Sequence, residues 1–389
     1  MHKQTYRILI TEFAEYDAAA EIPYLFKKAG CTVDVFCKKT SWLRKNSHVD
    51  KWIESGSGEE NYIEGLIALA SREDYDGIII VDDPADRIMN KAITDPELFA
   101  KILPLSRIEN RALLGSKRGL SELCTKYNVL TPPFTVYENG FDIASLATTV
   151  PYPLVMKIDE SAAGGGVFLC KNEAEVAAKL AQLSPTEKQN LLFQQYIPGG
   201  IVSVEALFGN GSLLAYAYST VTKTVVSEFD ISVDRLYSEC PKIEPALQSM
   251  GEAFGINGFA SITCMRDEAT GRHYFIEADL RPHGWFRADI AAGVDFSLAI
   301  RDWLDGTPAL YRPKIAKPFV MRNFSRDIRS CGIHKDPIGI LKWCFNIDHR
   351  WRDIPTYDPK MLGATFSYLS GVYARGIYKR AKKLVKNII

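Results

Sequence analysis

The chain has 389 residues, of which 47% are hydrophobic and 24% are charged. These values are typical of a soluble globular protein and exclude a disordered or fibrous chain, and the length predicts two or three domains. The 47 basic and 47 acidic residues cancel, so the net charge gives no reason to expect a nucleic-acid partner.

The eight cysteines are scattered and include no C-x-x-C pair, which argues against a zinc or redox motif. The N-terminus runs into a strand pattern without the apolar segment of a signal peptide. No apolar stretch approaches the roughly 20 residues that are needed to span a bilayer. We therefore predict a cytoplasmic protein.

The first hundred residues alternate between strand and helix patterns. Apolar, β-rich runs at 6–10, 32–36 and 76–81 are separated by helical patterns around 22–26 and 59–72. This alternation predicts a parallel, Rossmann-like sheet.

Acidic residues stand where the predicted parallel strands end. No glycine-rich fingerprint follows the first strand, so this sheet is not expected to bind a dinucleotide. Glu12, Asp82 and Asp83 follow the carboxyl ends of two strands, where such sheets bind ligands. These residues are either substrate contacts or ordinary loop acids.

Two lysines and a glycine run mark the middle of the chain. Lys117 opens a helix that runs to about Tyr127, and Lys157 lies inside the apolar strand 152–158. A lysine buried in a strand is costly unless it faces an anion. Three successive glycines follow: Gly164, Gly165 and Gly166. Such a run can expose backbone N–H groups to phosphate oxygens, although it is not a Walker loop because no G-K-[ST] follows.

The next segments are predicted to be mostly strands. A strand from 190 breaks at Pro198, and a segment of this kind between two subdomains can offer backbone groups to an adenine edge. An Asn-Gly hairpin at 210–211 and a helix over 244–254 follow. The strand 258–264 is expected to pair with residues 272–280 across a turn.

The segment 272–285 contains a strand with a polar face. On this strand His273, Phe275, Glu277, Asp279 and Arg281 share one side. Two carboxylates that are two residues apart repel each other unless a cation sits between them. A magnesium ion bound together with nucleotide phosphates would supply this cation. The alternative is an edge strand whose polar face points at water.

In this order the motifs resemble the ATP-grasp superfamily, especially its carboxylate–amine ligase and carbamoyl-phosphate-synthase-like branches. The resemblance covers roughly residues 106 to 305. It implies an α/β protein in which a Rossmann-like parallel sheet domain (1–105) precedes an ATP-grasp domain (106–310). ATP would lie between the two α+β subdomains of the latter, whose hinge is near 191–200, and a C-terminal extension (311–389) would follow.

The resemblance also implies roles for single residues. Lys117 and Lys157 would hold the α- and β-phosphates, and the glycine loop would close over the β- and γ-phosphates. Nucleotide contacts are further implied for Gln194, Gln195, Tyr196, Ile197 and Glu205, with the backbone of Gln195 and Ile197 reading the adenine. Glu277 and Asp279 would bind Mg²⁺, with Mn²⁺ as an alternative. Arg281 would stabilise the transferred phosphoryl group or the acyl phosphate.

The sequence departs from the family pattern at the metal site. Aspartate occupies position 279, where relatives usually have asparagine, and Ser261 stands where a metal-binding acid or amide is common. The missing ligand is supplied by Glu205, Asp267 or a water, or only one ion is held tightly.

Four residues have two open interpretations each. Lys223 either reaches the γ-phosphate as a catalytic residue or is solvated. His283 and Trp285 lie where an acceptor substrate is expected, although Trp285 is equally suited to the core. Arg287 either binds a substrate carboxylate or forms a surface salt bridge.

The end of the chain carries apolar residues at helical spacing between 373 and 386, with basic residues around them. Such a helix packs on its own domain or on a partner subunit, and a membrane surface is the alternative. The resemblance leaves a homodimer open.

The motifs together predict an ADP-forming ligase that activates a small-molecule carboxylate as an acyl phosphate and couples it to an amine, with ATP and Mg²⁺. One alternative is a carboxylase or carbamoyl-phosphate-type enzyme that uses bicarbonate. Another is a nucleotide-binding regulatory protein without turnover, which Ser261 favours.

Overall fold

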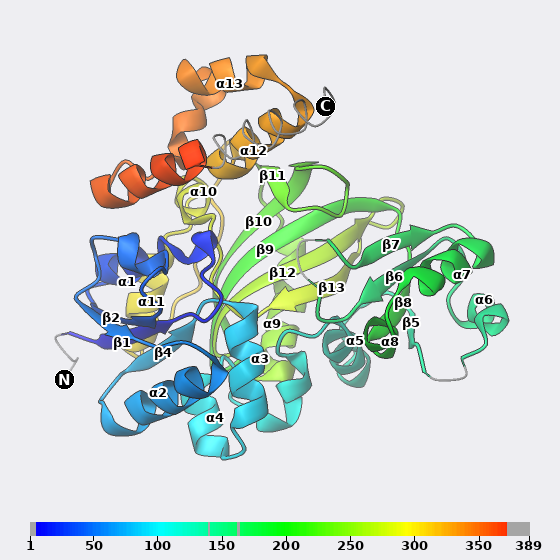
Figure 1. Ribbon diagram of the computed structural model, residues 1–389, viewed down its shortest axis with the longest axis horizontal. Helices are drawn as coiled ribbons and strands as arrows, with labels where there is room; N and C mark the ends of the chain where they lie inside the picture. Colours follow the sequence, from blue (N-terminus) through cyan, green and yellow to red (C-terminus); the bar gives the residue numbers. More distant parts are fainter. Residues whose placement is uncertain (1–4, 139–140, 162–163, 372–389) are drawn as a thin grey trace, which may run out of the picture.

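The computed structural model describes residues 5–138, 141–161 and 164–371. These residues form three β-sheets with helices packed on them (Figure 1). None of the helices in the described ranges is long and apolar enough to cross a membrane. The helix expected over 373–386 lies outside the described residues.

The N-terminal sheet has four parallel strands in the order β3-β2-β1-β4, as the alternating pattern predicted. Its central strands are almost fully buried because helices cover both faces. The strands are β1 (Arg7–Thr11), β2 (Thr32–Cys37), β3 (Lys51–Glu54) and β4 (Gly77–Ile80), and the helices are α1 (Ile22–Lys28), α2 (Glu59–Arg72), α3 (Asp83–Ala92) and α4 (Pro96–Ile102). The sequence pattern did not single out β3.

A small antiparallel sheet follows, in the order β5-β8-β6-β7. Its inner face is a separate hydrophobic core that includes Leu154, Met156 and Phe193. The strands are β5 (Phe134–Val136), β6 (Leu154–Ile158), β7 (Val167–Cys170) and β8 (Leu191–Gln195), and the helices are α6 (Leu146–Thr149), α7 (Glu173–Gln182) and α8 (Pro185–Gln189). The helix α5 (Lys117–Lys126) precedes this sheet in the chain, and its apolar side chains belong to the larger core instead.

The largest sheet has six strands in the order β13-β12-β9-β10-β11-β14. Residues 196–198 connect β8 of the small sheet to β9, so the predicted break at Pro198 is the passage between two sheets. The strands are β9 (Gly199–Gly209), β10 (Ser212–Thr224), β11 (Ser232–Tyr237), β12 (Gly258–Asp267), β13 (His273–Asp279) and β14 (Phe319–Arg322), with α9 (Glu244–Phe254) packed beside them.

The C-terminal extension is built onto the large sheet. Its first strand, β14, pairs with β11, and the helices that follow cover one end of the molecule near α1 and α10 (Figure 1). A buried carboxylate, Asp327, holds the extension together because it accepts hydrogen bonds from Trp343 and Arg350, each 2.9 Å long. The helices of the extension are α12 (Phe324–His334) and α13 (Pro337–Cys344), and α10 (Phe286–Ala291) and α11 (Phe296–Leu304) precede it in the chain.

Candidate functional site

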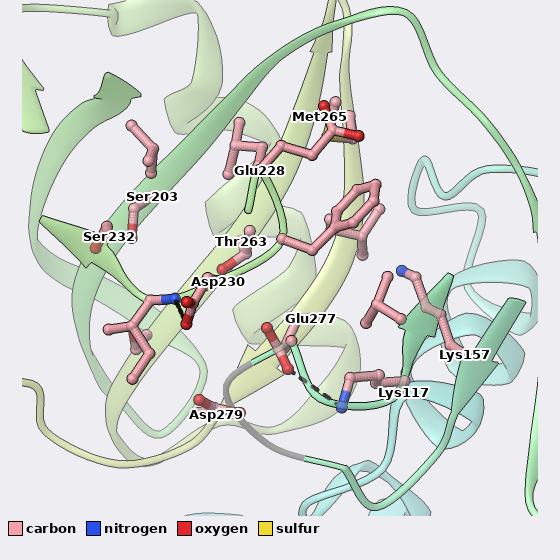
Figure 2. Close-up of a pocket in the computed structure, with 18 of the residues that line it drawn as sticks. Lys117, Lys157, Ser203, Glu228, Asp230, Ser232, Thr263, Met265, Glu277 and Asp279 are labelled. Carbon is pink, nitrogen blue, oxygen red and sulfur yellow. Dashed lines mark hydrogen bonds and ion pairs between the residues drawn. The ribbon is translucent and has the colours of Figure 1, made fainter. Parts of the chain in front are cut away.

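A pocket of about 290 Å³ lies between the small and the large sheet. Figure 2 shows Lys117 and Lys157 on one side of it and Ser203 and Ser232 on the other, with Glu277 between them. The residues that the sequence singled out and that line this pocket are Lys117, Lys157, Gly164, Gln194, Gln195, Tyr196, Ile197, Glu277, Asp279, Arg281, His283 and Trp285.

Lys117 is the first residue of α5. The helix begins there because the Ser116 hydroxyl accepts a hydrogen bond from the Gly119 N–H, which satisfies one free donor of the first turn. The Lys117 ammonium donates to the carbonyls of Asp159, at 3.1 Å, and Ser161, at 2.7 Å. It also lies 3.3 Å from Glu277 Oε1. Lys117 thus joins the loop after β6 to the strand β13.

Lys157 lies on β6, and its residue is only 5% exposed. Its ammonium donates a 2.6 Å hydrogen bond to Gln194 Oε1 on β8. Burial is the main reason that the pKa of Lys157 is lowered to about 8; Glu277 opposes this shift and Lys117 adds to it. Because an ammonium carries three donors, a phosphate in the pocket could both accept a hydrogen bond and favour the charged form.

The glycine loop is held by a second loop that the sequence pattern did not reveal. Gly164 has φ +72°, and a Cβ added there would lie 2.0 Å from the Phe229 carbonyl oxygen. Both the backbone conformation and the close approach therefore require glycine. Phe229 belongs to the segment between β10 and β11, which lines the pocket together with Gly164. Gly165 is exposed and Gly166 is buried.

The pocket has an apolar end beside the hinge, lined by Val155, Ile197, Met265 and Ile276. The N–H of Gln195 donates to the Pro133 carbonyl at 2.8 Å. That N–H is therefore already engaged, which leaves the Gln195 carbonyl and the Ile197 backbone for the adenine contact that the resemblance implied.

The acidic edge of the pocket, formed by Glu277 and Asp279, lies on β13. The prediction that Phe275 shares their face is wrong, because the register of β13 shifts between Phe275 and Glu277 and turns Phe275 into the core with Ala278. Asp279 pairs in register with Ser261 on β12, and Glu277 pairs with Thr263, so Ser261 is the neighbour across the sheet that the sequence predicted. Arg281 Nη2 donates to Asp279 at 2.9 Å. Burial raises the pKa of Asp279, and the nearby carboxylates of Asp83 and Glu277 raise it further.

The oxygen atoms at the acidic edge decide whether a magnesium ion fits there. Within the described ranges no group of three or more His, Cys, Asp or Glu side chains could hold a metal by itself. Two carboxylates, Glu277 and Asp279, face the pocket together with Ser261 and Thr263. Magnesium is often bound through one or two carboxylates while phosphates and waters complete its shell. The residues therefore fit magnesium that arrives with a nucleotide.

By sequence, the chain is similar to a known protein over less than half of its length. No protein-family model matches the chain. A phosphoribosylamine–glycine ligase of Clostridium acetobutylicum is 26% identical over 169 residues, which are 42% of this chain and 40% of that ligase. The chain thus matches less than half the length of this relative.

The solved structures are similar over most of the chain. N5-carboxyaminoimidazole synthetase of Staphylococcus aureus, complexed with ADP, has a TM-score of 0.65 and 18% identity and covers 87% of this chain and 88% of its own. The L-amino acid ligase of Bacillus licheniformis has a TM-score of 0.56 and 17% identity, with 79% and 76% covered. The protein has the ATP-grasp fold.

A third solved structure is also similar over most of the chain. It is the biotin carboxylase domain of the 2-oxoglutarate carboxylase of Hydrogenobacter thermophilus, complexed with MgADP, ADP and bicarbonate. Its TM-score is 0.63 at 15% identity, with 83% of this chain and 75% of that chain covered. The predicted fold class is thereby confirmed.

Besides Gly165 and Gly166, three predicted site residues do not line the pocket. Lys223 binds Asp327 at 2.7 Å because a bulge in β10 after Val221 reverses the alternation of its side chains. Glu205 is 1% exposed and pairs with Arg235 at 2.5 Å, so it does not replace the ligand missing at Ser261. The third residue, Arg287, forms ion pairs with Glu21 at 2.6 Å and with Asp353 at 3.5 Å.

Other acids also have structural partners. Asp267 binds Thr270 at the far end of β12. Glu12 is buried against the hydroxyl of Ser41, and Asp82 caps α3. Asp83 differs from these because its Oδ1 accepts a 2.6 Å hydrogen bond from Arg281. It therefore joins the N-terminal sheet to the acidic edge.

Two arginines of the pocket were missed by the sequence reasoning, Arg235 on β11 and Arg326 on α12. Both guanidinium groups lie over the ring of Trp285, at 4.5 Å and 5.6 Å from its centroid. Arg235 carried only the weaker signal of a cation inside a strand, because β11 reads Ser-Val-Asp-Arg-Leu-Tyr and lacks the apolar run that surrounds Lys157. Arg326 carried none, because it follows a strand far from the motifs.

Proposed function

We propose that the protein is an ADP-forming ligase that phosphorylates a small carboxylate with ATP and joins the acyl phosphate to an amine. The observation that carries this proposal is the meeting of Lys117, Lys157, Glu277 and Asp279 around one pocket between two sheets. The ATP-grasp fold and the names of the ligases with similar structures support it.

We propose a position for the nucleotide by matching its apolar and charged parts to the apolar and charged ends of the pocket. The adenine lies at the apolar end between Val155, Ile197 and Met265, where a planar ring is removed from water. The phosphates then extend past Lys157 toward Lys117 and Glu277. Magnesium, when bound at Glu277 and Asp279, neutralises phosphate charge.

Phosphoryl transfer depends mostly on position and charge, so cations and N–H groups suffice without a covalent nucleophile. Lys117 and Lys157 hold phosphate oxygens. Arg281 is oriented by its hydrogen bonds to Asp83 and Asp279, and its remaining N–H groups stabilise charge on the transferred group. The Gly164 loop and the Phe229 segment together keep water from the acyl phosphate.

Bicarbonate is the second candidate for the activated carboxylate. The likeness to a biotin carboxylase domain complexed with bicarbonate favours it, because that structure has a TM-score of 0.63. A regulatory role without turnover is favoured only by Ser261, which gives the acidic edge one ligand fewer than the pattern of the family.

The test is a measurement of product release from the purified full chain with Mg²⁺ and ATP. We expect ADP and phosphate to form when a carboxylate and an amine from a panel of amino acids and small acids are both present. Release with bicarbonate and an amine alone would select the second candidate. Formation of AMP, or ATP binding without release for any substrate, would contradict the ligase.

A further inference from the structure

The end of the pocket away from the lysines contains two arginines that the nucleotide does not need. Arg235 on β11 and Arg326 on α12 approach the same indole ring, that of Trp285, which is 2% exposed. Ser232 lies beside them, and Figure 2 shows it on the opposite side of Glu277 from Lys117 and Lys157. A nucleotide held by the lysines therefore leaves this end free for the second substrate.

The charges of the two arginines are balanced differently. Arg235 is neutralised by the buried carboxylate of Glu205, whose Oε1 lies 2.5 Å from Arg235 Nη1. In the described part of the chain, Arg326 has no carboxylate within ion-pair distance, and its guanidinium donates to the carbonyl of Ser232 at 3.1 Å. A guanidinium has five N–H donors. Asp17, Asp353 and Glu205 favour the charge of Arg326 from beyond ion-pair distance, so its remaining donors have no carboxylate paired with them among the described residues.

The surroundings make the charge of Arg326 costly. Burial and the like charge of Arg235 lower the pKa of Arg326 to about 10. A half-buried cation next to another cation is stabilised when an anion lies between or beside them. Stacking on Trp285 alone does not satisfy the N–H groups in the guanidinium plane.

The position of Arg326 gives a second substrate room to reach it. Ala18, Gly284 and Arg326 line both the main pocket and a smaller cavity of about 80 Å³. The smaller cavity lies where the N-terminal sheet domain meets the C-terminal extension and is also lined by Asp17 and Asp353. Arg326 thus stands between the nucleotide pocket and a space that the nucleotide does not fill.

We propose that Arg326, supported by Arg235 and Ser232, binds an oxyanion of the second substrate, either a carboxylate or a phosphate group. This subsite rests on the proposed function, because it assumes that the lysine side of the pocket holds the nucleotide. It restricts the second substrate to molecules that carry a carboxylate or phosphate group. The C-terminal extension thereby supplies a specificity residue to the ATP-grasp pocket.

The test compares Arg326→Gln with Arg329→Gln, which removes an exposed arginine one turn further along the same helix. Each protein is saturated with Mg²⁺ and a non-hydrolysable ATP analogue, and the apparent Kd of small probes is measured from the shift in Tm. The probes that carry an oxyanion are L-alanine, which is a zwitterion, succinate and inorganic phosphate. L-Alaninamide and succinamide are their counterparts without a carboxylate.

We expect an oxyanion probe to bind wild type and Arg329→Gln alike, and to bind Arg326→Gln at least about tenfold more weakly, as loss of a charge-assisted hydrogen bond requires. The amides should bind at least about tenfold more weakly than the acids. Binding of succinate or L-alanine identifies a carboxylate subsite, and binding of phosphate alone identifies a phosphate subsite.

The proposal is overturned if no oxyanion probe binds wild type, if Arg326→Gln binds the probes as wild type does, or if amides and acids bind equally. Titration of the ATP analogue into the same three proteins separates this outcome from failure of the proposed function. Arg326→Gln should keep the wild-type affinity for the analogue, since the lysine side is unchanged. The anion titration is repeated without nucleotide. The role of Arg326 in anion binding is therefore tested even if the ATP analogue does not bind.

Discussion

Lys157 allows the nucleotide site to be tested through both charge and pH. Replacing it with methionine keeps most of the apolar stem and removes the ammonium that faces the pocket. A hydrogen bond to a charged group contributes about 1.5–3 kcal/mol, so the affinity for Mg·ADP should fall about 10- to 150-fold at pH 7. The difference between the ordinary pKa of 10.5 and about 8 means that burying this charge costs about 3 kcal/mol.

The sign of the pH dependence follows from this lowered pKa. Above about pH 8 the free protein loses the Lys157 proton, whereas a bound phosphate restores the charged form. Mg·ADP binding should therefore take up a proton at pH 9, and its Kd should rise by up to about tenfold per pH unit between pH 8 and 10. Without nucleotide, the unfolded chain binds more protons than the native state between these pKa values, so stability should increase with pH.

The assay is isothermal titration calorimetry in two buffers of different ionisation enthalpy, at pH 7 and pH 9. Lys157→Arg, which stays charged, should bind without proton uptake, and Lys171→Met provides a control because Lys171 is exposed at the end of β7. Equal affinity of Lys157→Met and wild type at pH 7 would remove Lys157 from the site. Proton uptake by Lys157→Met at pH 9 would assign the titration to another group.

Three further predictions concern other parts of the site. Glu277→Gln should weaken Mg·ADP binding by about tenfold while ADP in EDTA binds as in wild type, and equal loss in both conditions would contradict a metal role. Gly164→Ala should lower the Tm and slow turnover because its Cβ meets the Phe229 carbonyl at 2.0 Å, and an unchanged Tm would argue against this packing. Lys223→Ala should retain nucleotide binding and lose less than about 1 kcal/mol of stability, since its ion pair with Asp327 is partly exposed. Urea unfolding measures the stability and calorimetry measures the nucleotide binding. Loss of nucleotide binding would show that Lys223 belongs to the site.

The sequence by itself determined the elements and the parts of the site that lie on single strands. Alternation from Glu277 to Asp279 put these two carboxylates on one face, although a register shift in β13 breaks the predicted alternation between Phe275 and Glu277. An apolar run around Lys157 indicated a buried cation that needs an anion. These inferences succeed because the facing of neighbouring side chains on a strand depends on local geometry alone. The pairing of Ser261 with Asp279 followed from a short connection between β12 and β13.

Only the tertiary structure decided which cations face the pocket. A single bulge turned Lys223 toward Asp327, and a bulge cannot be read from residue types. Glu205 forms an ion pair with Arg235 instead of facing the metal site. Arg235 lies on a different strand and was not singled out by any motif. Arg326 reaches the pocket because β14 pairs with β11, and such long-range pairing depends on the packing of whole sheets, which sequence periodicity does not encode.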